Sequence, residues 1–358
     1  MPKGLLAVKW DEVTGPEIIG KYPENLVIKE DDILRLFTTH AVGDEKERYL
    51  YMSSEDLKFS TYYTKWEDTP YLGVLILTLK ENPEEFKDIL PIYFSTMVEE
   101  IAEGEKITEA LQTTYEEILN SISYSEEQKI FLVFFEPVGV QIFKLLTEGA
   151  YTMEEIIRRL EDSFGQVTSM VNFDHYISVL KGARLVKEDR IAGILEPVFF
   201  LIRDVVLYRD PPIEIIKLAK KLPKEVKDKY IDAVKEFFEN YEVNEEDNAL
   251  LAITLLDNKY YEVFKKLRED CYSYEELIEV LQMEGEEFEE ILSTLEGLNI
   301  AIRFFGDEKT YVLLKTDFKA RTFKPEYMIN KVTEALINGK IDRDVAIEHL
   351  KLLKKEIS

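Results

Sequence analysis

The sequence predicts an α+β fold, in which an N-terminal five-stranded antiparallel sheet with helices is followed by two similar helical units and helical linkers. Two observations lead to this prediction. The run YLGVLILTLK at 71–80 is apolar on both faces between 72 and 79 and is bounded by Pro70 and Pro83, which indicates a central strand covered by helices. The second half of the chain contains an internal repeat in which helices precede paired strands.

The composition bounds the number of cores and disfavours two classes of partner. A chain of 358 residues is long enough for two or three hydrophobic cores. Its net charge of −26 repels nucleic acid and anionic membrane unless a local basic face overrides it. The longest apolar runs, 72–79 and 130–135, are far shorter than the roughly 20 residues of a spanning helix. We therefore expect no membrane span.

Cysteine usage indicates the compartment. Cys271 is the only cysteine, so we expect no intrachain disulfide and no cysteine-based metal site. The apolar run within the first ten residues, MPKGLLAVKW, is too short for a signal peptide. These features favour an intracellular, cytoplasmic protein.

The N-terminal third alternates strand and helix patterns. Its strands are expected at 5–10, 17–22, 49–52, 57–66 and 71–80. Gly15-Pro16 breaks the chain between the first two, so this pair is a predicted hairpin. A helix capped by Asp31 or Asp32 carries Ile33, Leu36 and Phe37 at the spacing of one buried face.

Capping residues place the next helix. Asn82 suits an N-cap and Pro83 the first helical position, and Gly104 marks the end. Pro91 lies inside this segment, so we expect a kink or a short break there. A further helix is expected at 106–121.

The order β-β-α-β-β-β-α-α over the first 121 residues resembles the longin (profilin-like) family. The residues that carry the resemblance are 5–10, Gly15-Pro16, Tyr22-Pro23, Phe37-Thr38-Thr39-His40 and 71–79. The resemblance implies a protein-interaction module, often a small-GTPase platform or a vesicle-trafficking subunit. The residues themselves indicate a small α/β domain with no catalytic chemistry.

The internal repeat aligns two segments of the C-terminal two thirds. The matching segments are 142–146 with 263–267, 151–157 with 272–278, Leu160 with Leu281, 200–204 with 313–317, and Pro212 with Pro325. In each copy a Thr152 or Ser273 N-cap is followed three residues later by Glu155 or Glu276, which is a capping box. Recurrence of these features strengthens the prediction for both copies.

Each copy is expected to contain three helices and then two strands. The third helix ends near Gly182 or Gly297. The strands are expected at 184–186 with 198–202, and at 300–304 with 311–314. Three helices followed by a β-hairpin resemble the winged-helix family. The combined chain is similar to archaeal longin and winged-helix proteins related to regulators of small GTPases and of membrane traffic.

These patterns divide the chain into five parts. They are a longin-like domain at 1–124, a first winged-helix unit at 125–212, a helical connector at 213–256, a second winged-helix unit at 257–325, and C-terminal helices at 326–358.

Charge on the third helix tests for DNA binding, because phosphate contacts come from Lys and Arg. Segment 284–301 has six glutamates and no base, so it is not expected to enter a groove. Segment 166–192 has three acids and four bases, Lys181, Arg184, Lys187 and Arg190. These four are candidate contacts for nucleic acid or for a protein partner. Acidic third helices favour protein docking over DNA binding.

No catalytic or cofactor constellation stands out. His40, His175 and His349 lie far apart in the sequence, and no Gly-rich loop precedes Lys-Ser or Lys-Thr. No basic neighbour activates the Cys271 thiol. We therefore predict no metal, no cofactor and no enzymatic activity. Tyr62, Tyr63 and Trp66 alternate along one strand, and any that is exposed is a candidate interface anchor.

Two hypotheses follow for function. The preferred one is a non-enzymatic protein-interaction scaffold that regulates or docks a small GTPase or a trafficking-like complex, with homo-oligomerisation through the longin-like domain left open. The alternative is a transcription regulator whose first winged-helix unit binds DNA through Lys181, Arg184, Lys187 and Arg190.

Overall fold

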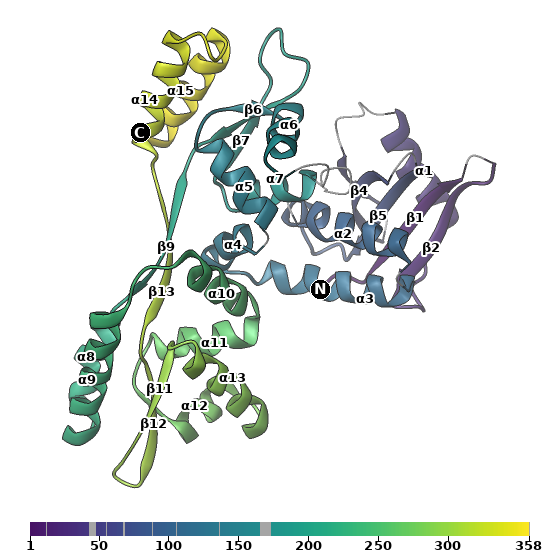
Figure 1. Ribbon diagram of the computed structural model, residues 1–358. Coiled ribbons are helices and arrows are strands. Elements are labelled where there is room, and N and C mark those ends of the chain that lie inside the picture. Colours follow the sequence, from purple (N-terminus) through teal and green to yellow (C-terminus); the bar gives the residue numbers. More distant parts are fainter. Residues whose placement is uncertain are drawn as a thin grey trace. The chain divides into compact units, whose positions relative to one another are not determined.

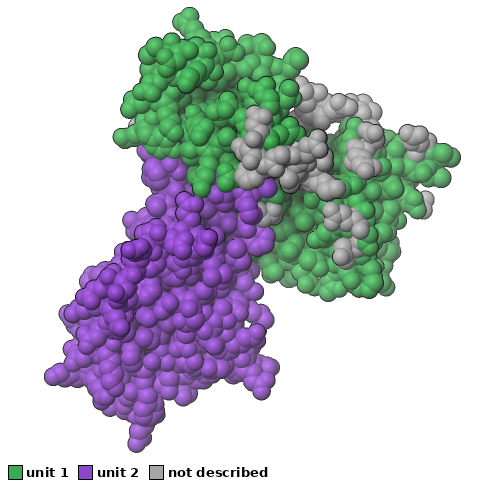
Figure 2. Space-filling view, in the orientation of Figure 1, with its two compact units in different colours: residues 1–124, 141–202, 326–358 green, residues 125–140, 203–325 purple. Residues whose placement is uncertain are grey.

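The computed structural model (Figure 1) describes residues 1–11, 13–42, 48–54, 56–66, 69–87, 89–104, 106–135, 137–164 and 173–357. They form two compact units, coloured separately in Figure 2. The first contains 1–124, 141–202 and 326–358, and the second contains 125–140 and 203–325. Each unit therefore gathers segments that are distant in the sequence. The predicted five-part division is finer than these units and stays a prediction.

The N-terminal part of the first unit is a five-stranded antiparallel sheet. In spatial order its strands are β2 (Gly15–Tyr22), β1 (Gly4–Asp11), β5 (Thr69–Leu77), β4 (Lys58–Trp66) and β3 (Tyr49–Ser53). The predicted central strand is β5, and its residues from Tyr71 to Leu77 are all buried. The predicted α+β class and this sheet are confirmed.

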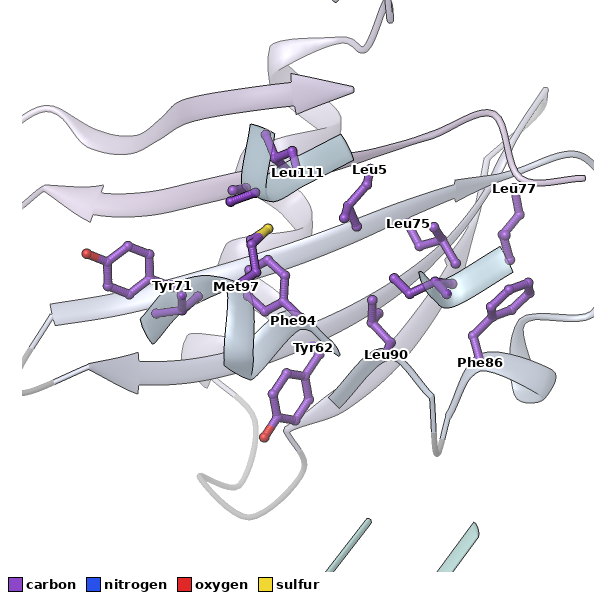
Figure 3. Close-up of a cluster of buried hydrophobic side chains, with 14 residues drawn as sticks. Leu5, Tyr62, Tyr71, Leu75, Leu77, Phe86, Leu90, Phe94, Met97 and Leu111 are labelled. Atoms are coloured by element: carbon purple, nitrogen blue, oxygen red, sulfur yellow. The ribbon is translucent and has the colours of Figure 1, made fainter. Parts of the chain in front are cut away.

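Helices cover both faces of the sheet. They are α1 (Glu30–Val42) on one face, and α2 (Leu90–Glu103) and α3 (Ile107–Ile122) on the other. Side chains of β5 alternate between the faces, so Val74 packs with Phe37 of α1, whereas Leu75 packs with Phe94 of α2 (Figure 3). Full burial of one such side chain stabilises the fold by roughly 1.5–3 kcal/mol. The apolar run predicted two covered faces, and both are present.

The break expected at Pro91 is present a few residues earlier, between Phe86 and Leu90. Asn82 accepts a hydrogen bond from the backbone N–H of Glu84 and caps a short 3-10 helix, η1 (Pro83–Phe86). Helix α2 then starts at Leu90, with Pro91 in its first turn, where the missing N–H of proline costs no helical hydrogen bond. It ends at Gly104, whose φ of 107° is left-handed.

Close packing of α2 on β5 depends on Gly73. A Cβ atom at this position would lie 2.4 Å from the ring of Phe94. Glycine therefore lets the Phe94 ring rest directly on the backbone of the central strand.

The two copies of the internal repeat have the same elements. In the first repeat they are α5 (Pro137–Leu146), β6 (Tyr151–Thr152), α6 (Met153–Phe164), α7 (Phe173–Gly182), β7 (Val186–Asp189) and β8 (Val198–Leu201). In the second repeat they are α11 (Asn258–Leu267), β10 (Tyr272–Ser273), α12 (Tyr274–Leu281), α13 (Gly285–Gly297), β11 (Ala301–Gly306) and β12 (Lys309–Leu314).

The predicted hairpins are β7–β8 and β11–β12. In each repeat a third, two-residue strand joins the hairpin, because the residues just before the second helix pair with β8 or β12. The sequence indicated only a capping role for these residues. Ser273 has both roles, since it also forms the predicted capping box with Glu276.

A two-stranded ribbon follows the hairpins and was not predicted. It pairs β9 (Asp204–Asp210) with β13 (Asp317–Phe323) in the second unit. Its register places Leu207 opposite Ala320, and these residues occupy matching positions of the repeat when Asp204 is aligned with Asp317. The ribbon is therefore symmetric about the pair formed by two equivalent residues.

The helices that follow each strand of the ribbon pack on the other repeat. They are α8 (Ile213–Leu218) and α9 (Lys224–Asn240) after β9, and α14 (Glu326–Ile337) and α15 (Arg343–Ile357) after β13. In the second unit the Tyr230 hydroxyl of α9 donates to the carbonyl oxygen of Leu314, at 2.7 Å. In the first unit Nε2 of His349 in α15 donates to the carbonyl oxygen of Leu201, at 2.9 Å. Each repeat is thus completed by helices from the other.

Two more helices flank the ribbon in the second unit, α4 (Glu126–Val133) and α10 (Glu245–Leu256). The Asn248 amide of α10 donates to the carbonyl oxygen of Leu207, at 3.1 Å. The backbone N–H of Ala320 donates to the Glu127 carboxylate of α4, at 3.2 Å. Side chains of α4 and α10 therefore satisfy outward-facing backbone groups on both edges of the ribbon.

Among the described residues, no helix is both long enough and apolar enough to cross a membrane. The part of segment 166–192 that lies at 166–172, included in the charge count above, falls outside the described residues.

The contact between Gly73 and Phe94 predicts a stability loss on substitution. Gly73→Ala forces the ring or the strand to shift, and overpacking of this kind lowers the free energy of unfolding by roughly 1–3 kcal/mol. Both tryptophans, Trp10 and Trp66, lie in this sheet, so tryptophan fluorescence during urea unfolding reports on it. The control is Gly285→Ala, since a Cβ at Gly285 would meet nothing within 4 Å. Equal midpoints for both variants would contradict the close approach.

Burial of His349 predicts an acid-dependent stability. Burial lowers the pKa of His349, against a smaller opposing effect of its hydrogen bond to Leu201. As the pH falls below about 6.5, the unfolded chain binds a proton that the folded chain excludes, so stability falls. His349→Gln keeps a donor but does not titrate, so we expect a shallower loss between about pH 7 and pH 5.5, by at most about 1.4 kcal/mol per pH unit.

Urea unfolding followed by circular dichroism at several pH values measures this effect. The matched control is Tyr230→Phe, which removes the equivalent hydrogen bond in the second unit without removing a group that titrates near neutral pH. It should lower stability by about 1 kcal/mol at every pH. Identical pH slopes for wild type and His349→Gln would refute the role of His349.

Candidate protein-interaction site

The third helices of the two repeats share one pattern. Aligned on Gly182 and Gly297, FDHYISVLKG of α7 matches FEEILSTLEG at 288–297. The inward positions stay apolar and are buried in both copies, as Phe173, Ile177 and Leu180, and as Phe288, Leu292 and Leu295. On the opposite face, Ser178 and Gly182 match Ser293 and Gly297, whereas His175 is replaced by Glu290.

In the first repeat another helix covers the outward face of α7. Helix α7 packs against α2 within the first unit, and Nδ1 of His175 lies 2.9 Å from the carbonyl oxygen of Ile92. Because residues three and four apart share a helix face, Ser178 and Val179 lie on the same side as His175. Val179 is only 6% exposed. The third helix of this repeat therefore binds a protein helix.

In the second repeat the matching face is open. Glu290, Ser293 and Gly297 of α13 are exposed, whereas the matching His175, Ser178 and Gly182 are half-buried. A Cβ atom at Gly297 would meet nothing within 4 Å. Within the part of the chain that the structure describes, the outward face of α13 contacts water.

The acids of α13 fall into two groups. Glu289 and Glu296 both bind Arg303 of β11, and Glu287 binds Lys259 of α11. These ion pairs tie the helix to its own repeat. Glu286 and Glu290, one helical turn apart, are exposed on the outward side. The outward face of α13 is therefore acidic.

The candidate base Lys181 has a structural role. It forms an ion pair of 2.8 Å with Glu188 of β7. The matching residues of the second repeat are Glu296 and Arg303, which form the same pair with the charges exchanged. Lys181 thus joins the third helix to the hairpin, as its acidic counterpart does.

The other three candidate bases occupy different surroundings. Arg184 has a φ of 56°, as does the matching Asn299, because both follow a helix end in the left-handed conformation. Lys187 binds Glu356 of α15, at 3.3 Å. Arg190 is exposed, and its backbone N–H donates to the carboxylate of Asp189. Lys181 and Lys187 are therefore already paired with carboxylates.

None of the three predicted interface anchors is an exposed residue. Tyr62 is 3% exposed and packs edge-on against Phe94 of α2. Tyr63 is half-buried beside Phe37 of α1, and Trp66 is half-buried against the α2 cluster. Their limited exposure follows from the helices that cover both faces of the sheet, and a role as interface anchors stays a prediction.

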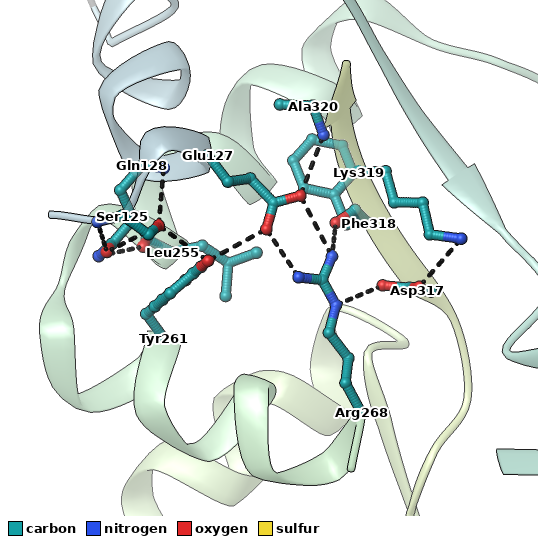
Figure 4. Close-up of polar contacts among 10 residues, drawn as sticks. All are labelled: Ser125, Glu127, Gln128, Leu255, Tyr261, Arg268, Asp317, Phe318, Lys319 and Ala320. Carbon is teal, nitrogen blue, oxygen red and sulfur yellow. Dashed lines mark hydrogen bonds and ion pairs between the residues drawn. The ribbon is translucent and has the colours of Figure 1, made fainter. Parts of the chain in front are cut away.

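Arg268 is the centre of a charge network in the second unit (Figure 4). Its guanidinium binds Glu127 of α4 at 2.7 Å and Asp317 of β13 at 2.6 Å. Lys319 binds Asp317 and Asp210. These residues line a pocket of about 480 Å³. Since its cations are bound to carboxylates, we assign this network to holding α4 against β13.

The side chains of His40 and Cys271 contact other residues of the same chain. Nε2 of His40 lies 2.8 Å from the Thr61 hydroxyl on β4. Burial, with a contribution from Asp270 and against an opposing effect of Lys221, raises the pKa of the Cys271 thiol to about 11, so this thiol is protonated near neutral pH. Among the described residues, no group of three or more His, Cys, Asp or Glu is placed to hold a metal ion.

No protein-family model and no curated protein matches this sequence. The functional assignment therefore rests on contacts within the chain. Sequence reasoning missed the outward residues of α13 as a site, although it noted their charge. The signal that could have found them is the ten-residue match between α7 and α13, of which only the glycines entered the prediction.

The exchanged ion pair predicts a charge-swap rescue. Lys181→Glu places two carboxylates together and should lower the thermal midpoint, while Lys181→Glu with Glu188→Arg should recover it. The two side chains are 36% and 38% exposed, so we expect a coupling of no more than about 1 kcal/mol. The midpoints are measured at low and high salt, where screening should shrink the difference. A double variant as unstable as the sum of its single variants would argue against the pair.

Proposed function

We propose that this chain is a non-enzymatic protein-interaction scaffold in which the third helix of each repeat binds a helix. One observation carries the proposal: α7 of the first repeat packs its outward face on α2 of the N-terminal domain. The repeat thus has a demonstrated mode of helix docking inside the molecule. The second repeat carries the matching helix with its face exposed.

The competing hypothesis is DNA binding through the first repeat. Two exposed arginines, Arg184 and Arg190, speak for it. Against it, α2 covers the face of α7 that a groove would need, and Lys181 and Lys187 are paired with carboxylates. The acidic α13 would repel phosphates. Protein docking is therefore the better-supported function.

The N-terminal domain supplies the proposed identity of one partner. Its resemblance to the longin family supports a small GTPase or a trafficking-like complex as that partner. Because helices cover both faces of the sheet, such a partner would contact the helices or the edge strands β2 and β3. The same edges offer a route to a homo-oligomer.

A DNA titration separates the two hypotheses. We expect no binding of a short duplex at about 50 mM salt, where phosphate attraction is strongest. Binding with a clear salt dependence that is lost in Arg184→Glu with Arg190→Glu would establish the competing hypothesis. The control pair Lys217→Glu with Lys220→Glu removes the same charge from α8 and η3 (Ala219–Lys221) in the second unit.

Native purification tests the scaffold directly. The tagged full-length chain, recovered at low salt from its own cells, should retain a protein in fixed proportion. The amount of that protein is compared with a tag-only sample and after a wash at about 500 mM salt, which screens surface charges. Recovery of the chain alone in repeated preparations would count against a scaffold.

A further inference from the structure

We propose that the outward face of α13 is a docking site for a basic amphipathic helix of a partner protein. This face consists of Glu286, Glu290, Ser293, Thr294 and Gly297. The inference rests on the proposed scaffold function and goes beyond it, because it names one surface and the chemistry of its occupant.

The first argument is the precedent in the first repeat. Position for position, Ser293 and Gly297 match Ser178 and Gly182 of α7. Small residues four apart let two helix backbones approach closely, and α2 does pack on α7. In α13 these residues are exposed, so the same approach is open from solvent.

The second argument is a change of donor to acceptor at one position. In the first repeat His175 faces the carbonyl oxygen of Ile92 in the bound helix, and an imidazole N–H can donate to it. The matching residue of α13 is Glu290, and a carboxylate only accepts hydrogen bonds. A helix that docks on α13 must therefore bring donors of its own.

The third argument identifies those donors as cations. Arg303 and Lys259 are already bound to Glu287, Glu289 and Glu296. An arriving helix meets Glu286 and Glu290, which are exposed and one turn apart. Lys or Arg side chains one turn apart on the partner would match both carboxylates, and charge-assisted hydrogen bonds are the strongest available. Helix α2 itself does not fit, because its only charged residues are three glutamates.

A peptide probe tests the site on the full-length chain. The probe is a labelled helical peptide with the sequence of α2, LPIYFSTMVEEIAE, in which all three glutamates are replaced by Lys. The unmodified peptide is the comparison. Fluorescence anisotropy should show that the basic peptide binds the wild-type chain and that the acidic peptide binds at least about tenfold more weakly.

Matched variants locate the binding. Glu286→Lys with Glu290→Lys should raise the Kd of the basic peptide at least about tenfold, as expected for lost charge complementarity. Glu239→Lys with Glu246→Lys makes the same charge change at exposed positions of α9 and α10 and should change the Kd less than about threefold, through long-range charge alone. Ser293→Tyr keeps the charge but blocks close approach, and should also weaken binding. Circular dichroism confirms that each variant is folded.

Three results would overturn the assignment. They are equal binding of the two peptides, wild-type affinity in the α13 charge variant, and wild-type affinity in Ser293→Tyr. If the charge variant fails to bind the peptide yet a duplex DNA binds the wild-type chain, the site is real but the scaffold proposal is wrong. If native purification still recovers a partner with the charge variant and the peptide does not distinguish the variants, the scaffold stands and the α13 assignment falls.

Discussion

The pairing of β9 with β13 is the interaction on which the C-terminal two thirds depend. The two strands come from different repeats, and their backbone hydrogen bonds are satisfied by each other and by side chains of α4 and α10. Because they pair, the helices that follow each repeat lie against the other repeat. Tyr230 and His349 then make the same contact, each with the last leucine of a hairpin strand. Neither repeat has a complete core without this exchange.

The two repeats have similar cores and different surfaces. The inward residues of α7 and α13 stay apolar because both must fill the same core. The outward residues are free to differ, and they do: His175 faces a backbone carbonyl, whereas Glu290 faces solvent. In the first repeat this face of α7 packs on α2 of the N-terminal domain. In the second repeat the matching face of α13 is exposed and acidic.

Sequence reasoning failed where partners lie far apart in the chain. Counting charges gave a slight excess of bases near Lys187, but a count cannot show that Glu356 of α15 neutralises it. Likewise, Tyr62 alternates along its strand as an exposed residue would, yet α2 covers that face. In both cases the environment of the side chain is set by a segment many residues away, which its neighbours in sequence do not reveal.

The sequence by itself determined the features that depend on neighbouring residues. A continuous apolar run placed β5 at the centre of the sheet, Asn82 and Pro83 marked a helix start, and the capping box of Ser273 marked another. These signals are local because hydrogen bonds of caps and turns close over a few residues. Only the tertiary structure decided that Leu207 pairs with Ala320 and that α2 packs on the outward face of α7. The local pattern of β9 and β13 does not specify the strand edge with which each one pairs, because that edge comes from a segment distant in the sequence.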